Sequence, residues 1–458
     1  MTFDNGPLRA LVQRYDLSGP RYTSYPTVPA WTTDFGESDY QSALNRFSEA
    51  PEPLSLYVHI PFCNSRCYYC GCNVVIKRHD PALGTPYLDA LAQEITGVTQ
   101  HLPAKPLVHQ FHIGGGTPNY LEDDQTRRLF QMFHDRFEFA ETAEISIEVD
   151  PRYLTREMLL TLKELGVNRI SMGIQDFDPT VQKSVNRVQS VESVTEVMNW
   201  SQELQIGSIN MDLIYGLPFQ TAETMQRTID QVIQLRPDRI AFYSYAHIPG
   251  QISHQKILDA YPMAEGEEKL NLFLNGRSQL IEAGYQAIAM DHFALPTDEL
   301  AQAFNARKLY RNFMGYTTQP AFQYLGFGVS AIGNIAGTFV QNIKEIAPYI
   351  DSVSQGRLPV TRGILLTPDD AIRQWVIGQL MCHFEVDKAV FEHKFILSFD
   401  HYFEDEFKHL QPFIDDGLIQ NKTATLLVQE SGRWFVRNIA MVFDAYLAKQ
   451  PQQFSRTV

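Results

Sequence analysis

The stretch Leu54-Ser-Leu-Tyr-Val-His-Ile-Pro-Phe-Cys-Asn-Ser-Arg-Cys-Tyr-Tyr-Cys-Gly-Cys-Asn73 holds the most informative pattern in the chain. Its first seven residues read as a strand, and three cysteines, Cys63, Cys67 and Cys70, follow within one short loop. Three thiolates so close together favour one iron–sulfur or zinc centre. They are one ligand too few for a closed site, so a four-iron cluster held by them would keep one iron open for chemistry.

The alternative is a structural zinc site in a binding module without catalysis, with Cys72 as the fourth ligand. Cys70 and Cys72 are only two residues apart, whereas a zinc ribbon normally brings a second pair from far along the chain. The remaining cysteine, Cys382, has no cysteine near it. We therefore favour the cluster and expect Cys72 to be an unliganded loop residue.

The composition is that of an intracellular enzyme. With 458 residues the chain is long enough for two or three domains. It has five cysteines, an odd number, and opens without a signal-peptide pattern, so we expect a reducing, cytoplasmic location. The longest stretch without a formal charge, 312–343, is interrupted by glycines and does not read as a membrane span.

The net charge of −15 disfavours nucleic acid as a partner. An anionic substrate would need a local group of cations to override this field. Candidates are Arg21, Arg187, Arg307, Lys308 and Arg311, although a solvated surface charge is the alternative for each.

The middle of the chain alternates short apolar runs with helix-like segments. The predicted strands are 54–60, 108–113, 144–149, 169–175, 208–215 and 239–245, and the predicted helices are 87–101, 123–137, 155–165, 191–204 and 222–235. This alternation predicts an α/β fold with parallel strands, either a doubly wound sheet or an open (βα)6 partial barrel of the TIM type.

Unusual residues gather where these strands end, which is where parallel α/β barrels form their sites. They are the cysteine loop, the turn 114–118 with its three glycines, Glu148, Gln175, Asp212 and the segment 243–247. The glycines suit either a plain tight turn or a close approach to a ligand. Glu148 suits either a solvated strand end or a contact with ribose hydroxyl or amino groups.

Two flanking regions have different patterns. Residues 1–50 hold prolines and tyrosines with little periodicity, and we predict an arm that lies over the barrel mouth as a lid or wraps the surface. Residues 51–365 form the predicted catalytic barrel with its extension. Residues 366–458 form a mainly helical accessory domain, with helices at 370–382, 402–416 and 436–448 and a short run at 423–429.

The cysteine spacing, with the aromatic Tyr69 before the third cysteine, resembles the radical S-adenosylmethionine (SAM) superfamily. From end to end the chain is similar to the oxygen-independent coproporphyrinogen III oxidases. The segments that carry this likeness are 18–26, 57–63, 70–73, 144–151, 171–177, 212–218, 290–293, 311–313, 315–319 and 453–456. The resemblance selects the open partial barrel of the radical SAM kind.

The resemblance implies a cofactor set, residue by residue. Cys63, Cys67 and Cys70 would hold a [4Fe-4S] cluster, and SAM bound to it would contact Tyr57, Gly115, Glu148 and Ile332. A second SAM would contact Gly116, Thr117, Gln175, Arg187, Asp212 and Ala246. Tyr57, Arg21 and Arg311 are the predicted catalytic residues. Leu295 replaces a basic residue of the relatives, which puts a substrate contact at that position in doubt.

The implied activity is an oxidative decarboxylation. A 5′-deoxyadenosyl radical would start the conversion of two propionate side chains of coproporphyrinogen III into vinyl groups, giving protoporphyrinogen IX in anaerobic haem biosynthesis. The implied partners are this tetrapyrrole, an electron donor and an electron acceptor, with the protein a monomer. The alternative within the superfamily is a haem chaperone without decarboxylase activity, although such relatives usually lack the Cys-Gly-Cys ending and the N-terminal arm found here.

Overall fold

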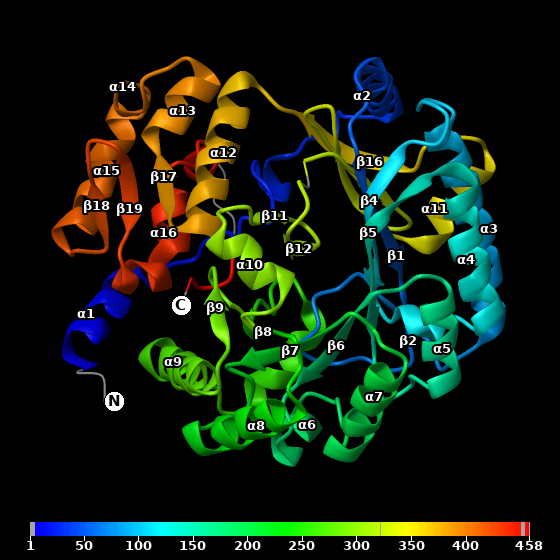
Figure 1. The fold of residues 1–458 in the computed structure, drawn as a ribbon, viewed down its shortest axis with the longest axis horizontal. Helices are drawn as coiled ribbons and strands as arrows, with labels where there is room; N and C mark the ends of the chain where they lie inside the picture. Colours follow the sequence, from blue (N-terminus) through cyan, green and yellow to red (C-terminus); the bar gives the residue numbers. More distant parts are fainter. Residues whose placement is uncertain (1–4, 321, 450–453, 458) are drawn as a thin grey trace.

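The computed structural model describes residues 5–320, 322–449 and 454–457, and its largest element is a twelve-stranded sheet (Figure 1). Six neighbouring strands in this sheet run parallel and follow chain order: β1 (Leu54–Ile60), β4 (Leu107–Gly115), β5 (Glu138–Val149), β6 (Arg169–Gln175), β7 (Ser208–Tyr215) and β8 (Arg239–Ser244). The predicted α/β fold with an open (βα)6 partial barrel is therefore confirmed.

Helices cover the outer face of these parallel strands (Figure 1). They are α3 (Gly84–Thr99), α4 (Asp123–Arg136), α5 (Arg156–Glu164), α6 (Pro179–Ser184), α7 (Val191–Glu203), α8 (Ala222–Leu235) and α9 (Gly266–Glu282). Helix α8 shows why such segments fold: the Thr221 side chain accepts a hydrogen bond from the Thr224 amide at its start. Its buried side chains Met225, Ile229 and Val232 then recur at helical spacing and face the sheet.

The sheet extends beyond the six strands at both edges, which the sequence pattern did not predict. Next to β1 lie β13 (Tyr324–Phe327), β14 (Ile332–Ile335), β15 (Thr338–Asn342) and β16 (Val360–Leu365), and next to β8 lie β10 (His292–Ala294) and β9 (Gln286–Ile288). Of these added strands, only β13 pairs in parallel. Strands of three to six residues carry too little periodicity to be recognised by pattern.

Several smaller elements complete the barrel region. They are β2 (Phe62–Cys63) paired with β3 (Val75–Ile76), the hairpin of β11 (Tyr310–Asn312) and β12 (Gly315–Thr317), and helices α10 (Glu299–Asn305) and α11 (Ile346–Ser354). Short 3-10 helices lie at Val28–Ala30, Pro81–Leu83, Pro118–Tyr120, Ser253–Ala260, Glu430–Phe435 and Leu447–Lys449.

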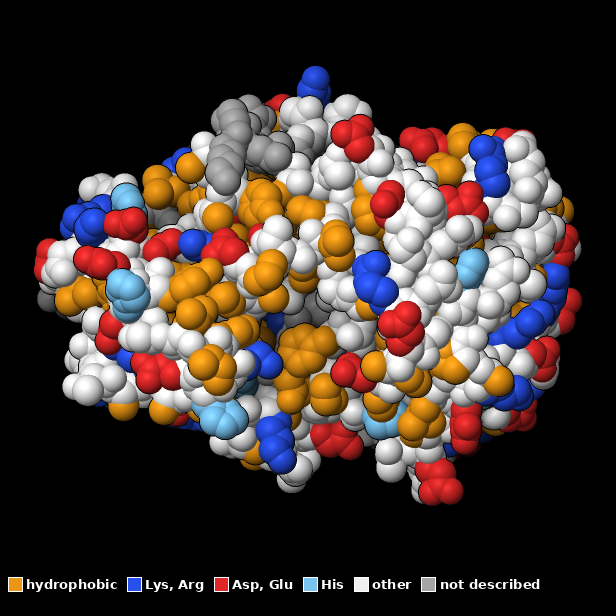
Figure 2. All heavy atoms as spheres, turned by 90° about the horizontal axis from the view of Figure 1, so that it is seen from above, with side chains coloured by type: hydrophobic (Ala, Val, Ile, Leu, Met, Phe, Trp, Pro, Cys, Tyr) orange, Lys and Arg blue, Asp and Glu red, His pale blue; other side chains and the backbone are white. Residues whose placement is uncertain are grey.

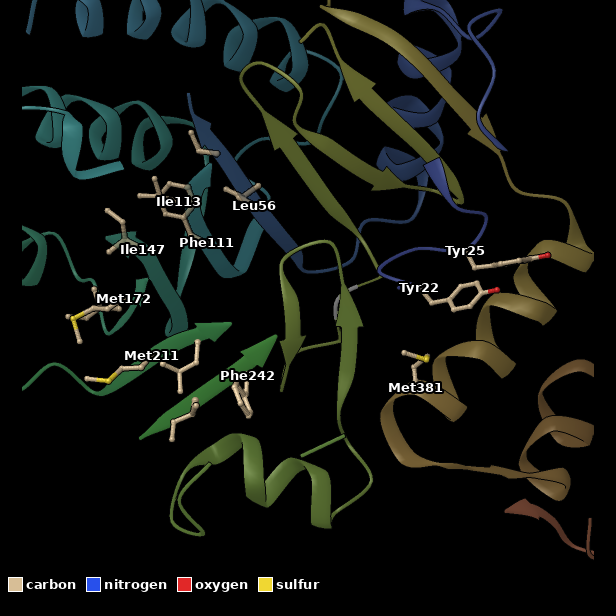
Figure 3. Packing of buried hydrophobic residues seen from close by; sticks show 14 of the residues in the cluster. Tyr22, Tyr25, Leu56, Phe111, Ile113, Ile147, Met172, Met211, Phe242 and Met381 are labelled. Carbon is tan, nitrogen blue, oxygen red and sulfur yellow. The ribbon is translucent and has the colours of Figure 1, made fainter. Parts of the chain in front are cut away.

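The N-terminal region contains two helices, α1 (Asn5–Tyr15) and α2 (Glu37–Glu49), although little periodicity was seen there. Between them the chain is held by the C-terminal region. The Tyr22 hydroxyl bonds to the Asp444 carboxylate at 3.0 Å, and both Tyr22 and Tyr25 are buried beside helix α12 (Figure 3).

The C-terminal region is mainly helical, with α12 (Pro368–His383), α13 (Lys388–Phe395), α14 (Phe399–Tyr402), α15 (Glu404–Asp415) and α16 (Val436–Met441). It also contains a small antiparallel sheet of β17 (Glu385–Asp387), β19 (Thr425–Val428) and β18 (Ile419–Asn421). The single helix expected at 402–416 is interrupted at Phe403, and the last one is shorter than expected.

The predicted boundaries at residues 50 and 365 stay predictions. Residues 1–4 of the predicted arm, Gln453 of the segment 453–456 and Val458 lie outside the described residues. Among the described helices, none is both long enough and apolar enough to cross a membrane.

The largest core cluster fills the space between the sheet and its outer helices and continues into the N-terminal arm and the C-terminal helices (Figure 3). Phe111 on β4 is fully buried, and its ring centre lies 5.6 Å from that of Phe130, 4.9 Å from Phe133 and 5.7 Å from Phe139. Such an aromatic cluster fixes α4 against the sheet, and with it the strand ends that α4 connects.

We expect Phe111→Ala to lower the free energy of unfolding by about 3–5 kcal/mol, because it leaves a cavity among these rings. Leu107→Ala on the same strand is the control, since Leu107 is 38% exposed and should cost under about 1 kcal/mol. Denaturant unfolding of both variants measures the difference. Equal losses would contradict the assignment of the core.

Candidate active site

The carboxyl ends of the parallel strands open into a cleft of about 230 Å³. Ten of the residues predicted for the site line it: Cys63, Cys67, Cys70, Gly115, Gly116, Thr117, Glu148, Gln175, Arg187 and Asp212. The structure thus brings together residues spread over about 150 positions of sequence at one edge of the sheet.

The cysteine loop leaves β1 and is closed at its base by the pairing of β2 with β3. The Cys63 thiol lies 3.3 Å from the Thr117 hydroxyl. The Cys70 sulfur accepts a hydrogen bond from the Cys72 amide at 3.4 Å, and the Cys67 sulfur accepts one from Arg187 at 3.7 Å. Each of the three sulfurs therefore has its own partner in the surrounding chain.

The thiols differ in their readiness to ionise. Hydrogen bonding by Cys72 lowers the pKa of Cys70 to about 7 against the opposing effect of burial. Burial raises the pKa of Cys63 to about 11, although its contact with Thr117 acts the other way. Because metals bind the thiolate, binding at Cys63 must displace a proton near neutral pH.

This donor set fits a cluster better than it fits zinc. A four-iron cluster takes each cysteine on a different iron, so thiols spread along the wall of a cleft suit it. Cys72 also lines the cleft, but its thiol is engaged with Cys70.

The three glycines after β4 are required by packing. A Cβ on Gly114 would lie 2.9 Å from the Glu148 carboxyl group, and one on Gly115, whose φ is +117°, would lie 2.8 Å from the His59 ring. A Cβ on Gly116 would lie 2.7 Å from a backbone oxygen and 3.1 Å from the Cys63 sulfur. Only glycine lets this turn close onto the cysteine loop.

Glu148 presents an ionised carboxylate to the cleft. It accepts hydrogen bonds from the Gly115 amide at 3.1 Å and from His112 at 3.3 Å. Burial opposes its charge, but the hydrogen bond and charge of His112 outweigh burial and lower the pKa of Glu148. Its side chain is still 43% exposed, so it retains lone pairs for a hydroxyl or ammonium donor.

Two histidines that sequence reasoning missed support this carboxylate. Tyr57 stacks on His112 with ring centres 5.9 Å apart, and its hydroxyl lies 3.0 Å from the His59 ring. Alternation along β1 and β4 could have indicated them, because Tyr57, His59 and His112 are polar positions between buried apolar ones.

Arg187 is held at the back of the cleft by a carboxylate that was not predicted. Its guanidinium donates to the Gly173 carbonyl at 2.5 Å and to Asp150 at 3.2 Å. Asp150 also binds Arg152 at 2.7 Å, and the two arginines lower the pKa of Asp150 against the effect of burial. Asp150 thus aligns Arg187 with the Cys67 sulfur.

A second cavity, of about 130 Å³, lies inside the barrel and shares Glu148, Ser171 and Asp212 with the cleft. Asp212 accepts hydrogen bonds from Asn210 at 2.8 Å and Ser171 at 3.1 Å. Burial, and then the negative charge of Glu148, raise the pKa of Asp212 to about 6. Tyr243 and His292 also line this cavity.

Five predicted site residues lie outside the lining of the cleft. Tyr57 lies beside the histidines. Ile332 begins β14 and packs in an apolar cluster with Trp31. Ala246 follows β8 and its carbonyl accepts a hydrogen bond from Gln255. Arg21 and Arg311 lie near the carboxyl end of β8, where Arg21 donates to the Ser244 carbonyl at 2.6 Å.

Leu295, where a substrate contact was in doubt, lies at the opposite end of the barrel from the cleft. Strand β10 runs antiparallel to β8, so Ala294 pairs with Arg239, the first residue of β8. The Leu295 amide then bonds to the Asp238 carbonyl, at the amino end of β8. The surface cations Arg307 and Lys308 are also exposed, and Arg307 pairs with Glu385.

We expect Asp212→Asn to change how stability depends on pH in the protein free of cofactors. The wild-type carboxyl has a raised pKa in the fold, so it stabilises the fold below about pH 4, and this contribution is lost as the pH rises through about 6. The amide cannot ionise, so the variant should gain roughly 1–3 kcal/mol relative to wild type between about pH 4 and 8. Denaturant unfolding across this range measures the gain, and a pH-independent difference would contradict it.

Comparison with known proteins identifies the relatives of the chain. The Radical SAM superfamily model matches residues 57–232, and the HemN C-terminal domain model matches residues 366–435. The oxygen-independent coproporphyrinogen III oxidase of Escherichia coli (strain K12) is 45% identical over 451 residues, covering 98% of each chain. The protein of the same name from Pseudomonas aeruginosa is 44% identical, again over 98% of each chain.

A solved structure of coproporphyrinogen III oxidase (HemN) from Escherichia coli, described as a radical SAM enzyme, superposes with a TM-score of 0.90. The two are 43% identical, and the match covers 96% of this chain and 98% of the other. Similarity in sequence and fold over nearly the whole length shows that the chain belongs to the oxygen-independent coproporphyrinogen III oxidase family of the radical SAM superfamily.

Proposed function

We propose that this chain converts two propionate side chains of coproporphyrinogen III into vinyl groups, giving protoporphyrinogen IX in anaerobic haem biosynthesis. The observation that carries the proposal is the full-length similarity to relatives named for this substrate. The cleft, with its three thiols and an ionised carboxylate, supplies a matching donor set.

Membership of the radical SAM superfamily implies a [4Fe-4S] cluster and SAM. Cys63, Cys67 and Cys70 would hold the cluster. Tyr57, Gly115, Glu148 and Ile332 would take the SAM that binds to its open iron. When bound together, the cluster and SAM supply a 5′-deoxyadenosyl radical, a species able to remove a hydrogen atom from a saturated carbon.

The protein's own share is positioning and shielding. Each propionate must lose one hydrogen atom, CO2 and one electron, and no side-chain base is needed for this balance. Glu148 can fix hydroxyl or amino groups in the cleft, because His112 keeps it ionised. The walls of the cleft and of the cavity inside the barrel would limit the access of water and competing hydrogen donors to the reacting carbon.

Arg21 and Arg311 are the residues we assign to the substrate carboxylates, and Tyr57 is assigned to the SAM side of the reaction. Arg21 joins the arm to the carboxyl end of β8, and the Arg311 guanidinium lies 4.4 Å from the centre of the Tyr316 ring. Arg311 thus lies against a residue that lines the cavity inside the barrel, since Tyr316 is part of that lining. The electron donor and acceptor would be separate molecules.

A second SAM site is part of the same proposal, formed by Gly116, Thr117, Gln175, Arg187, Asp212 and Ala246. The first five of these residues line the cleft beside the cysteine loop, which supports the assignment, whereas Ala246 lies outside the lining.

A cytoplasmic location is supported by the need to keep the cysteine ligands as free thiols. The monomeric state stays a prediction.

The activity is tested with protein purified without oxygen, reconstituted with iron and sulfide, and supplied with SAM, reductant and coproporphyrinogen III. We expect 5′-deoxyadenosine and a porphyrin product lighter by two CO2 and four hydrogens, both measured by mass spectrometry. Cys63→Ser should lose cluster iron and both products, because it removes a ligand. Cys72→Ser is the matched control and should keep all three.

Deoxyadenosine without any change in the porphyrin would contradict the proposed substrate. If the protein then bound haem, the haem-chaperone alternative would replace the decarboxylase. Iron loss in Cys72→Ser but not in Cys63→Ser would contradict the assigned ligand set instead.

The second SAM site is tested by the binding stoichiometry of labelled SAM on the reconstituted protein. We expect two SAM molecules per chain in the wild type and one in Gln175→Ala, because Gln175 contributes to the second site only. Gln202→Ala, an exposed position on α7, is the control and should keep two. One SAM molecule per wild-type chain would refute the second site.

A further inference from the structure

Four cationic side chains from distant parts of the chain meet beside the carboxyl end of β8. Arg21 donates to the Ser244 carbonyl at 2.6 Å, and Lys269 of α9 donates to the next carbonyl, that of Tyr245, at 3.0 Å. Arg311 reaches the Arg21 carbonyl at 3.5 Å. The fourth is Arg437 of α16. Burial lowers the pKa of both Arg437 and Lys269, and the positive charge of Arg21 is the second cause of lowering in each case.

Arg437 is only 4% exposed and has no carboxylate partner among the described residues. Its nitrogens instead donate to backbone carbonyls from both ends of the chain: those of Gly19, Pro20, Arg456 and Thr457. Backbone carbonyls satisfy its hydrogen bonds but cannot neutralise its charge as an ion-paired carboxylate would.

The carboxylates nearest to this cation cluster also hold other groups, although the charge of Asp291 acts on Arg21 and Arg311 and that of Asp16 acts on Lys269. Asp291 binds His292 at 2.8 Å, and Asp16 binds Arg456 at 2.7 Å. Glu265 faces Lys269 but is exposed to solvent. Within the described parts of the chain, none of the four cluster cations forms an ion pair. An excess of positive charge therefore gathers here, although the chain as a whole carries −15.

Lys269 is placed with little freedom. Its stem crosses the turn after β7, where a Cβ on Gly216 would lie 2.7 Å from the Lys269 Cε, and Gly216 has a φ of +85°. The ammonium lies 5.9 Å from the centre of the Tyr215 ring. A lysine held this way has only a carbonyl acceptor, and the charges of Asp16 and Glu265 oppose those of Arg21 and Arg437 around it, so a bound anion would offset the cost of its burial.

The cluster lies next to the cavity inside the barrel. Arg311 stacks over Tyr316, a residue that lines this cavity, and its Nε has no hydrogen-bond partner in the described structure. Tyr243 is also in the lining; burial and the negative charges of Asp212 and Asp291 raise its pKa, whereas the positive charges of Arg311 and Arg21 lower it. An anion at the cluster could therefore belong to a molecule that extends toward the cleft.

We infer that Lys269 is a substrate-binding residue that, together with Arg21 and Arg311, holds a propionate carboxylate of the tetrapyrrole, with the buried charge of Arg437 nearby. The inference rests on the proposed function and adds Lys269 to its substrate side. The carboxylates of coproporphyrinogen III lie at the rim of the ring, so one of them can bind at β8 while another side chain reaches the cleft.

The test uses the reconstituted enzyme and Lys269→Met, which keeps an unbranched stem over Gly216 and Tyr215 but removes the charge. We expect the KM for coproporphyrinogen III to rise at least about ten-fold, with kcat changed less than about three-fold, because a charged hydrogen bond to the bound substrate is lost. Lys269→Arg should restore most of the affinity. Lys163→Met is the control, since Lys163 also donates to a single backbone carbonyl, at 2.8 Å, but lies on the outer helix α5.

A second measurement does not depend on turnover. Coproporphyrin III, the stable oxidised form of the substrate, is titrated into the reconstituted enzyme and its fluorescence is followed. Weaker binding by Lys269→Met and recovery by Lys269→Arg would support the site even if the wild type fails to decarboxylate, in which case only the proposed function fails. Unchanged binding by Lys269→Met overturns the inference.

Folding of the variants is checked by thermal unfolding. If Lys269→Met does not fold, Lys269→Gln takes its place, because this shorter neutral side chain also removes the charge. Porphyrin binding equal to wild type in Lys269→Gln would then refute the inference, and a loss of about ten-fold would support it.

Discussion

Parallel pairing of β1 with β4 is the constraint on which the site depends. The register places Ile60 opposite Gly115, so the cysteine loop and the glycine turn leave the sheet side by side. Pairing of β4 with β5 then brings Glu148 to the same edge. Because parallel strands all end on one side, residues that are far apart in sequence converge without any dedicated contact between them.

The cleft and the inner cavity form one electrostatic unit around two carboxylates. Glu148 is kept ionised by His112, and its charge makes ionisation of Asp212 harder. Arg187 supplies the opposite charge at the back of the cleft, where Asp150 holds it. A ligand with both positive and negative groups therefore finds complementary partners along a single wall.

The two ends of the chain lie together at Arg437. Arg437 binds carbonyls near residue 19 and near residue 456, so the arm and the C-terminal region are fixed to each other. A Cβ on Gly19 would lie 2.5 Å from the Met441 sulfur, so a larger residue there would require the Met441 side chain to move. This arrangement brings Arg21 to β8 and gathers positive charge in a molecule whose net charge is −15. Figure 2 shows one face of the molecule, which carries acidic, basic and hydrophobic side chains and is partly hollowed.

The sequence by itself determined the six parallel strands and the cysteine loop, because apolar periodicity and ligand spacing are local properties. It did not indicate β13 to β16, which are short and gain their stability from pairing with β1 and with one another. Only the tertiary structure decided that Lys269 and Arg437 join Arg21, and that Leu295 lies at the far end of β8. Such encounters depend on long-range packing, which brings together residues hundreds of positions apart and leaves no periodic trace in the sequence.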